Sequence, residues 1–389
     1  MELSRELIIE NFKTYPLLGD SIFGWLSLSF EQIQGTKSSC FRLLPRLAQV
    51  LRKDSQLGQS WFSREILAVV GLRARDVAPI AVVIVNYNTR EYLRECLESV
   101  QLETPSEIVV VDNASTDGSC NMVRGNFPAV ILHENMWNVG YGAAANQGIA
   151  SCTAEYVLLL NSDTRVSAGA LQALSAYLDQ HPKVAVIGPR LVNPNGSLQP
   201  SCYAFPGTLT WFLHYEVSGQ IIRRVPILAN HQQRTFPHTH PQAVPWVMGA
   251  ALAIRREPFD AVDGFDESYF MYCEETDLCY RLNRAGWQVH FAPVATITHT
   301  GEASTKQHRT EMAVQQVASK LLFYRRHYSK LRFLLLALMI RGTVLARLLF
   351  DIYRLRLAHN VCHPAGMEAD IAAWRRVLLG KWKPQTIRS

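Results

Sequence analysis

Four short apolar segments recur between residues 80 and 163, and each ends in polar residues that form turns. They are IAVVIVNYN (80–88), EIVVVDNAS (107–115), AVILHEN (129–135) and EYVLLLNSD (155–163). Apolar residues at helical spacing follow the first segment, from 92 to 100. Strands that are apolar on both faces and alternate with helices predict an α/β fold. We expect a Rossmann-like, mainly parallel central sheet with helices on both faces.

The same alternation continues beyond residue 163. A helix is predicted over 167–180, and VAVIGPRLVNPNGSLQPS (184–201) predicts two strands joined by an NPNG turn. Residues 202–243 are irregular and rich in proline, histidine and aromatic residues, which suits a loop over a site. Regular structure returns with WVMGAALAIRRE (246–257) and continues to about residue 305.

Length and composition favour a large core with extensions. The chain has 389 residues, 48% of them hydrophobic, which allows roughly two domains. We predict a helical N-terminal extension at 1–78, an α/β domain at 79–308 and a basic, apolar helical region at 309–389. The net charge of +6 is too diluted to indicate a nucleic acid, so no nucleic-acid partner is expected.

The longest apolar stretch is LRFLLLALMIRGTVLARLLFDIY (331–353), which approaches the ~20 residues of a membrane span. It carries Arg332, Arg341 and Arg347, and each arginine opposes insertion by about 2.5–3.5 kcal/mol. A helix lying in the membrane interface therefore fits better, and the alternative is a helix packed in a protein core. Because the segment MELSRELIIE lacks a signal-peptide pattern, we expect a cytoplasmic protein, peripheral on the cytoplasmic face of the inner membrane through 320–356.

Polar side chains at the predicted strand ends are candidates for nucleotide binding. Asn86 and Asn88 end the first strand, and Asp112 and Asn113 end the second. A carboxylate at a strand end can accept a hydrogen bond from a ribose hydroxyl or from the N–H of a base, and ligands bind such sheets at this edge. The alternative is ordinary turn chemistry, because Asp and Asn often bond their own backbone at such places.

A second group of polar residues suggests a metal ion. Asp163 offers a hard oxygen ligand and Asn161 a weaker carbonyl ligand, which suits Mg²⁺ or Mn²⁺ that also binds substrate phosphates. His299, in ITHTGEAST, could complete such a shell or contact a diphosphate, although a lone histidine is more often structural. The glycine-rich segment NVGYGAAANQG (138–148) could hold an anion at a helix start or could pack a helix tightly against the sheet.

Three acids crowd the segment YFMYCEETDLCYRL (269–282). Apolar spacing predicts a helix here that ends near Gly286, so Glu274, Glu275 and Asp277 fall in its first turn. The helix dipole favours acids there by about 0.3–1 kcal/mol each, but three exceed that need. A carboxylate projecting from this turn into a cleft could instead accept a proton from an attacking hydroxyl.

Seven of these segments, taken in order over residues 80–305, resemble the family 2 glycosyltransferases of the GT-A fold, and most closely their rhamnosyltransferase-like bacterial members. They are VVIVNYN, IVVVDNASTDGS, NVGYGAAANQG, YVLLLNSD, WVMGAALAIRRE, GFDESYFMYCEETDLCYRLNRAGW and HTGEAST. The resemblance implies an inverting, metal-dependent transfer of a sugar from a nucleotide-diphosphate donor, such as dTDP-rhamnose or a UDP-sugar. The acceptor would be a hydroxyl of a glycan or a lipid-linked glycan, in surface polysaccharide biosynthesis.

The resemblance also implies roles for individual residues. Glu275 takes the position of the catalytic base, which in the family is usually an Asp, so the longer side chain is a departure that could reposition the base. Glu274 and Trp246 are assigned to the acceptor side. The implied metal ligands are Asp163, Asn161 and His299. The implied donor contacts are Asn86, Asn88, Asp112, Asn113, Asn138, Gly140, Asn146, Ser162, Gly249 and Ala250.

Two other interpretations remain open from the sequence. A nucleotide-sugar-binding pseudoenzyme or membrane scaffold would explain the Glu-for-Asp exchange as decay, although Asp163, Glu275 and His299 are all retained. A nucleotidyltransferase would use a nucleotide as well, but its glycine-rich loop bearing Arg or Lys after the first strand is missing. Release of a nucleoside diphosphate in the presence of donor and acceptor distinguishes these interpretations.

Overall fold

The computed structural model describes residues 78–206, 238–301, 309–357 and 367–379. All of them belong to one compact unit, Ala78–Ser389. Residues 1–77 of the helical extension predicted at 1–78, and most of the predicted loop over the site, therefore lie outside the described residues.

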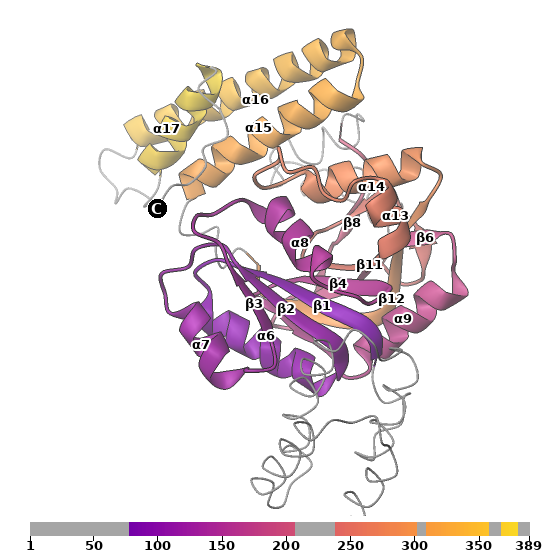
Figure 1. The fold of residues 1–389 in the computed structure, drawn as a ribbon. Helices are drawn as coiled ribbons and strands as arrows, with labels where there is room; N and C mark the ends of the chain where they lie inside the picture. Colours follow the sequence, from indigo (N-terminus) through magenta and orange to yellow (C-terminus); the bar gives the residue numbers. More distant parts are fainter. Residues whose placement is uncertain (1–77, 207–237, 302–308, 358–366, 380–389) are drawn as a thin grey trace, which may run out of the picture. The chain divides into compact units, whose positions relative to one another are not determined.

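A mixed sheet forms the centre of the described fold (Figure 1). Its main path runs in the order β3-β2-β1-β4-β11-β6-β12-β5. These strands are β3 (Ile131–Glu134), β2 (Pro105–Asp112), β1 (Ala78–Asn86), β4 (Tyr156–Asn161), β11 (Ala251–Arg255), β6 (Val184–Val192), β12 (Gln288–His299) and β5 (Thr164–Val166). The pairs β3–β2, β2–β1, β1–β4 and β6–β12 are parallel, whereas β11 runs antiparallel to both of its neighbours.

Short strands complete the sheet region. β7 (Leu198–Gln199) pairs with β6, and β9 (Gln242–Ala243) pairs with β12. β8 (Cys202–Tyr203) and β10 (Trp246–Val247) form a separate two-stranded sheet. Because β7 follows β6 after the predicted NPNG turn, this hairpin agrees with the sequence pattern.

Helices cover both faces of the sheet, because the strands bury alternate side chains on each face. Ile80, Val82 and Ile84 pack with helices α6 (Arg90–Leu102), α7 (Ser119–Asn126) and α9 (Ala170–Gln180). Ala81, Val83 and Val85 pack on the other face with helices α8 (Tyr141–Ala150), α13 (Arg256–Ala261) and α14 (Glu274–Arg284). The predicted α/β architecture is therefore confirmed over the described residues.

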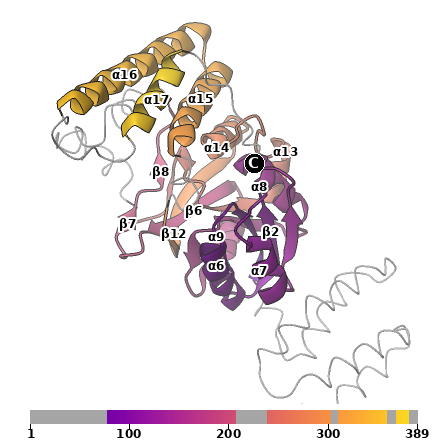
Figure 2. The ribbon, with the colours of Figure 1, turned by 90° about the vertical axis from the view of Figure 1, so that its left-hand side faces the viewer.

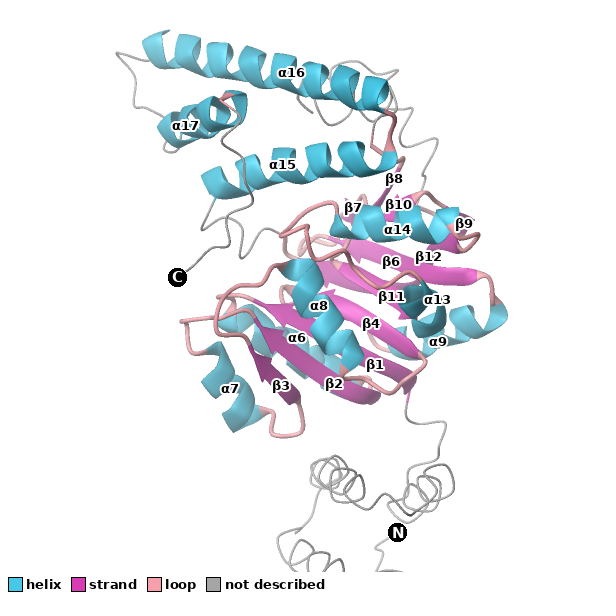
Figure 3. Cartoon of the chain, turned by 45° about the horizontal axis from the view of Figure 1, so that its top comes forward, coloured by secondary structure: helices cyan, strands magenta, loops and turns pink. Residues whose placement is uncertain are grey.

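Three helices follow the sheet region: α15 (Arg309–His327), α16 (Lys330–Leu357) and α17 (Met367–Leu378). They surround a second core that also includes Tyr269 and Cys273, the residues just before α14. Figures 2 and 3 show α15 beside α14, with α16 on the side of α15 that is distant from the sheet. The C-terminal helices are therefore packed against the segment that precedes the three acids.

The strand ends meet as the sequence pattern predicts. In the sheet register, Asn86 at the end of β1 is paired with Asp112 at the end of β2, and Val85 is paired with Asn161 at the end of β4. Parallel strands place their carboxyl ends at one edge, so residues more than twenty positions apart become neighbours there.

Candidate active site

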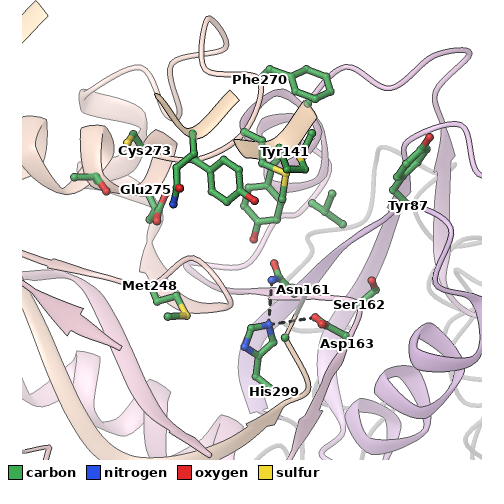
Figure 4. Close-up of a pocket in the computed structure, with 18 of the residues that line it drawn as sticks. Tyr87, Tyr141, Asn161, Ser162, Asp163, Met248, Phe270, Cys273, Glu275 and His299 are labelled. Atoms are coloured by element: carbon green, nitrogen blue, oxygen red, sulfur yellow. Dashed lines mark hydrogen bonds and ion pairs between the residues drawn. The ribbon is translucent and has the colours of Figure 1, made fainter. Parts of the chain in front are cut away.

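A cavity of about 1370 Å³ opens at this edge of the sheet. Its lining comes from the ends of β1 and β4, the start of α8, the start of α14, the end of β12 and one face of α15. Figure 4 shows Glu275 and Tyr141 on one side of the cavity, with Asp163 and His299 across from them.

Asp163 and His299 meet because a short antiparallel pairing joins their strands. Asp163 lies in the turn between β4 and β5, and His299 ends β12, where its register partner is Thr164 of β5. Asp163 Oδ1 lies 3.3 Å from His299 Nε2, and both side chains are buried. Asn161 Nδ2 lies 3.5 Å from the same nitrogen, a weak contact. The three predicted metal ligands are therefore brought together.

The side chains of Asp163, His299 and Asn161 suit a divalent ion that takes its remaining ligands from water and substrate. A carboxylate and an imidazole at the rim of a cavity suit Mn²⁺ or Mg²⁺, which take water and substrate phosphate oxygens for the remaining positions. No group of three or more His, Cys, Asp or Glu residues that could hold a metal occurs in the described ranges. The residues present thus provide part of a shell and leave the rest to substrate.

Glu274 and Glu275 begin α14, as the sequence predicts, and the backbone just before them is strained. Tyr272 and Cys273 both have positive φ, 66° and 65°, a conformation that costs a residue with a side chain about 1–3 kcal/mol. Such strain persists only where the surroundings impose it. Here the surroundings include the second core, in which Cys273 is buried among α15 residues. Packing therefore fixes the direction in which the acids leave the helix.

Gly140 brings the start of α8 against the same segment. Its φ is +93°, and a Cβ atom there would lie 2.5 Å from the carbonyl oxygen of Phe270, so only glycine fits. The amide of Tyr141 donates to that oxygen at 2.9 Å, and the Tyr141 hydroxyl donates to the carbonyl oxygen of Gly249 at 2.9 Å. A Cβ on Gly249 would lie 3.6 Å from the side chain of Glu275.

Burial changes the proton affinity of both glutamates. Desolvation raises the pKa of Glu275 from 4.5 to about 7. Desolvation, and then the charge of Glu275, raise the pKa of Glu274 well above its ordinary value. Within the described part of the chain, the Oε2 atoms of both residues are buried and have no hydrogen-bond partner. Glu274 therefore holds its proton more tightly than an exposed glutamate does, while Glu275 lines the cavity with a carboxyl group that can lose or accept a proton.

Asp277, the third acid, has a structural role as the acceptor of buried hydrogen bonds. It is 1% exposed and accepts hydrogen bonds from His327 Nε2 at 2.6 Å and from Arg281 Nε at 2.7 Å. Burial would raise the pKa of Asp277, but His327 and Arg281 outweigh it and lower the pKa. Because His327 ends α15, this pair fastens the C-terminal helices to α14.

The polar rim at β1 and β2 is connected by hydrogen bonds. Asn86 Nδ2 donates to Asp112 Oδ1 at 2.7 Å, and Ser115 Oγ accepts from both Asn86 Nδ2 and the amide of Asn88. Asn86, Asn88 and Asp112 do not line the cavity, whereas Asn113 does. In this structure the hydrogen bonds of Asn86, Asn88 and Asp112 stabilise the ends of β1 and β2 next to the cavity. The donor-binding roles of these residues and of Asn113 remain predictions.

Of the other residues predicted to bind the sugar donor, some line the cavity and one bonds the backbone away from it. Asn138, Gly140 and Ser162 line the cavity. Asn146 does not, because its amide group bonds the backbone of Phe265 on both sides, with Nδ2 donating to O and Oδ1 accepting from N, each at 2.9 Å.

The residues around the glutamates also differ in their access to the cavity. Gly249, Ala250 and Glu274 lie behind the lining, and Trp246 lines the cavity while its indole donates to Ala204 O at 2.8 Å. Their predicted roles toward donor and acceptor remain predictions.

One wall of the cavity comes from a helix that the sequence patterns did not connect with the site. Met312, Ala313, Gln316 and Lys320 line it from α15, and Lys320 is only 6% exposed. The residues lie on one helix face at spacings near three and four, which is a pattern also typical of core packing. Because α15 lies outside the matched motifs, no signal in the chain connected it with the site.

Comparisons with known proteins agree on one family. The family model "Glycosyl transferase family 2" matches residues 81–260. The chain is 34% identical over 244 residues to the N-acetylglucosaminyl-diphospho-decaprenol L-rhamnosyltransferase of Mycobacterium tuberculosis (strain ATCC 25618 / H37Rv), covering 59% of this chain and 78% of that relative. It is 24% identical to a low-salt glycan biosynthesis hexosyltransferase of Haloferax volcanii, over 70% of this chain and 85% of that one.

A solved mannosyltransferase from Pyrobaculum calidifontis, in complex with GDP-Man and Mn²⁺, matches with a TM-score of 0.47 and 17% sequence identity. That match covers 89% of this chain and 97% of the mannosyltransferase.

Proposed function

The chain belongs to glycosyl transferase family 2 and is a glycosyltransferase. We propose that it transfers a sugar with inversion of the configuration at the anomeric carbon, and that Glu275 is the general base. The donor is a nucleoside-diphosphate sugar, dTDP-rhamnose or a UDP-sugar, and the acceptor is a hydroxyl of a lipid-linked glycan. The name of the mycobacterial relative, which specifies rhamnose and a diphospho-decaprenol acceptor, supports both substrate classes.

One observation carries the assignment of the base: Glu275 lines the cavity across from Asp163 and His299, with a pKa raised to about 7 by burial. A general base works best when its pKa is near the working pH. Glu275 accepts the proton of the acceptor hydroxyl while that oxygen bonds to the anomeric carbon. The bond from this carbon to the diphosphate breaks on the opposite face, which inverts the configuration.

Glu274 supports this role through its charge state. Two adjacent carboxyl groups resist ionising together, and the charge of Glu275 raises the pKa of Glu274, so Glu275 is the member of the pair that ionises first. The strained backbone at Tyr272 and Cys273 holds both side chains at the helix start. The longer glutamate in place of the family's usual aspartate is therefore compatible with a functioning base.

The leaving group departs toward the Asp163 side of the cavity. Asp163 and His299 would hold a Mn²⁺ or Mg²⁺ ion, with Asn161 beside them. When bound, such an ion neutralises the charge that develops on the departing diphosphate. Ser162 and Asn138 line the same cavity and are placed to contact the donor.

The acceptor side of the proposal involves the C-terminal helices. α16 has the length and composition of a membrane span over Lys330–Tyr353, with a mean hydropathy of 2.0. One of its faces packs into the second core through Leu336, Ala337 and Ile340. Large apolar side chains on the other face are exposed: Leu331, Leu334, Leu335, Leu338, Met339, Leu345, Leu349, Phe350 and Tyr353. This division favours a helix lying on a membrane surface over one that crosses it. The proposed surface is the cytoplasmic face.

The exposed basic residues on α16, Lys330, Arg332 and Arg341, would face anionic head groups. We expect the protein to sediment with vesicles containing anionic lipid and to sediment much less with purely zwitterionic vesicles. Equal binding to both vesicle types, or to neither, would contradict the proposed surface contact.

Nucleoside diphosphate release from a panel of donors, with and without Mn²⁺ and acceptor, tests the function. We expect one donor to give acceptor-dependent release. Glu275→Gln should abolish transfer, because an amide cannot accept the proton, and should leave donor affinity measured by calorimetry unchanged.

Glu257→Gln is the matched control, since Glu257 is exposed on α13 and does not line the cavity. Turnover near the wild-type rate in Glu275→Gln would remove Glu275 as base. Donor binding without release for every donor and acceptor would favour the nucleotide-sugar-binding pseudoenzyme.

A further inference from the structure

The turn Asn193–Ser197 and the short strand β7 that follows it reach the proposed metal-binding histidine, although they lie outside the seven segments that resemble the family. Gln199 lines the cavity, and its Oε1 atom lies 2.7 Å from His299 Nδ1. The other ring nitrogen, Nε2, faces Asp163 and Asn161 (Figure 4). The hydrogen bond at one nitrogen of an imidazole determines which nitrogen carries the proton. The identity of the group that Gln199 presents to Nδ1 is therefore decisive.

A chain of hydrogen bonds fixes the orientation of the Gln199 amide. It starts at the backbone amide of Ser197, which can only donate, and which bonds Asn195 Oδ1 at 3.0 Å. The Ser197 hydroxyl also donates to that oxygen, at 2.6 Å, and so accepts from Asn193 Nδ2 at 2.9 Å. Asn193 Oδ1 then accepts from Gln199 Nε2 at 3.1 Å. The oxygen of Gln199 is thereby turned toward His299.

The direction of every bond in this chain follows from the single backbone donor at its start. Because Gln199 presents an oxygen, His299 Nδ1 must donate and therefore carries the proton. In the neutral imidazole the lone pair is then on Nε2, on the side of Asp163. Asp163 Oδ1, 3.3 Å from Nε2, can only accept, so Nε2 also attracts a proton when no metal is bound; a divalent ion beside Asp163 would take the place of that proton and bind the lone pair.

We propose that Gln199 is a positioning residue that holds His299 in the Nδ1–H tautomer, so that the Nε2 lone pair faces the metal position beside Asp163. This inference rests on the proposed role of His299 as a metal ligand. Partners of this kind orient ligating histidines in metal sites, and their loss lowers metal affinity by about 10–100-fold.

The turn itself explains why the hairpin can perform this task. Asn193 N donates to Ser197 O at 2.8 Å, and Gly196 N donates to Asn193 O at 2.8 Å, with Gly196 at a φ of +80°. These backbone bonds hold the two asparagines and the serine of NPNGS in reach of one another. β7 then carries Gln199 back along β6 to the end of β12.

The tautomer is measured first, on the full-length protein labelled with ¹⁵N-histidine and supplied with diamagnetic Mg²⁺, by two-bond ¹⁵N–¹H correlation spectra. The His299 signals are identified by their absence in His299→Ala. We expect the Nδ1–H tautomer in the wild type and in Gln199→Glu, whose carboxylate still accepts from Nδ1. We expect its loss in Gln199→Leu. An Nε2–H tautomer in the wild type would overturn the inference.

Mn²⁺ affinity, measured calorimetrically with Mn²⁺ alone, is the second readout. Gln199→Leu should weaken it by about 10–100-fold, and Gln199→Glu should restore it. Gln101→Leu makes the same chemical change at an exposed position away from the cavity and should have no effect. Thermal unfolding of each variant verifies that it folds.

Failure of the inference and failure of the proposed metal role give different results. If Gln199→Leu binds Mn²⁺ like the wild type while His299→Ala does not, the positioning role is refuted and the metal role stands. If His299→Ala itself binds Mn²⁺ like the wild type, the proposed metal role of His299 is refuted, and the inference with it.

Discussion

Replacing Glu275 with glutamine should make the protein more stable at neutral and alkaline pH. The reason is that the folded state must pay to ionise this carboxyl group: burial raises its pKa from 4.5 to about 7. Between these two values the folded state binds more protons than the unfolded state. The free energy of unfolding therefore decreases as the pH rises through this window and levels off above about pH 7.

The magnitude follows from the size of the pKa change. Each unit of pKa shift corresponds to about 1.4 kcal/mol, so the shift from 4.5 to about 7 corresponds to about 3 kcal/mol of stability. Solvent reaches part of the side chain, so this value is an upper limit. Glutamine does not ionise, and the variant should gain up to this amount relative to the wild type at about pH 8, with little gain near about pH 4.5.

Urea unfolding of both proteins, followed by tryptophan fluorescence across this pH range, gives the stability difference at each pH. Glu257→Gln, at an exposed position, should show a difference that does not change with pH. Two results would refute the reasoning that burial raises the pKa of Glu275. One is a stability difference for Glu275→Gln that does not change with pH, and the other is a wild type that becomes more stable relative to the variant as the pH rises.

Ionisation of Glu275 lowers the stability of the folded protein but raises its catalytic activity. Below about pH 7 the protonated Glu275 cannot accept a proton, so kcat/KM should fall as the pH decreases through this value. The cost to stability and the gain in basicity have a single cause, which is the removal of water from the carboxyl group.

Three further substitutions test the surroundings of the base. Asp163→Ala should weaken metal-dependent donor binding, and unchanged calorimetric affinity in the presence of Mn²⁺ would count against its role as a ligand. Gly140→Ala should cost about 2 kcal/mol or more in urea unfolding, because the new Cβ would meet the Phe270 carbonyl oxygen; wild-type stability would show that the loop yields easily. Asp277→Asn should destabilise the protein by about 3 kcal/mol at neutral pH by breaking the pair with His327. Since the pKa of Asp277 is lowered, the wild type should lose this advantage as the pH falls below about 4, and a loss that persists in acid would contradict it.

Local patterns in the sequence were sufficient for most elements of the sheet region. The apolar runs before Asn86, Asp112 and Asn161 became β1, β2 and β4, and the acids after Cys273 became the first turn of α14. Such patterns are readable because a buried strand or an amphipathic helix shows its periodicity within about ten residues. The reversed direction of β11 was not readable, since pairing depends on a partner almost a hundred residues away.

The sequence by itself determined that three acids would share one helix start and that polar residues would end neighbouring strands. Only the tertiary structure separated the acids, because burial, the neighbouring carboxylate and a histidine fifty residues away gave Glu274, Glu275 and Asp277 different proton affinities. It likewise brought α15 to the cavity and Gln199 to His299. Desolvation and hydrogen-bond direction depend on which distant segments meet, and a linear pattern does not contain that information.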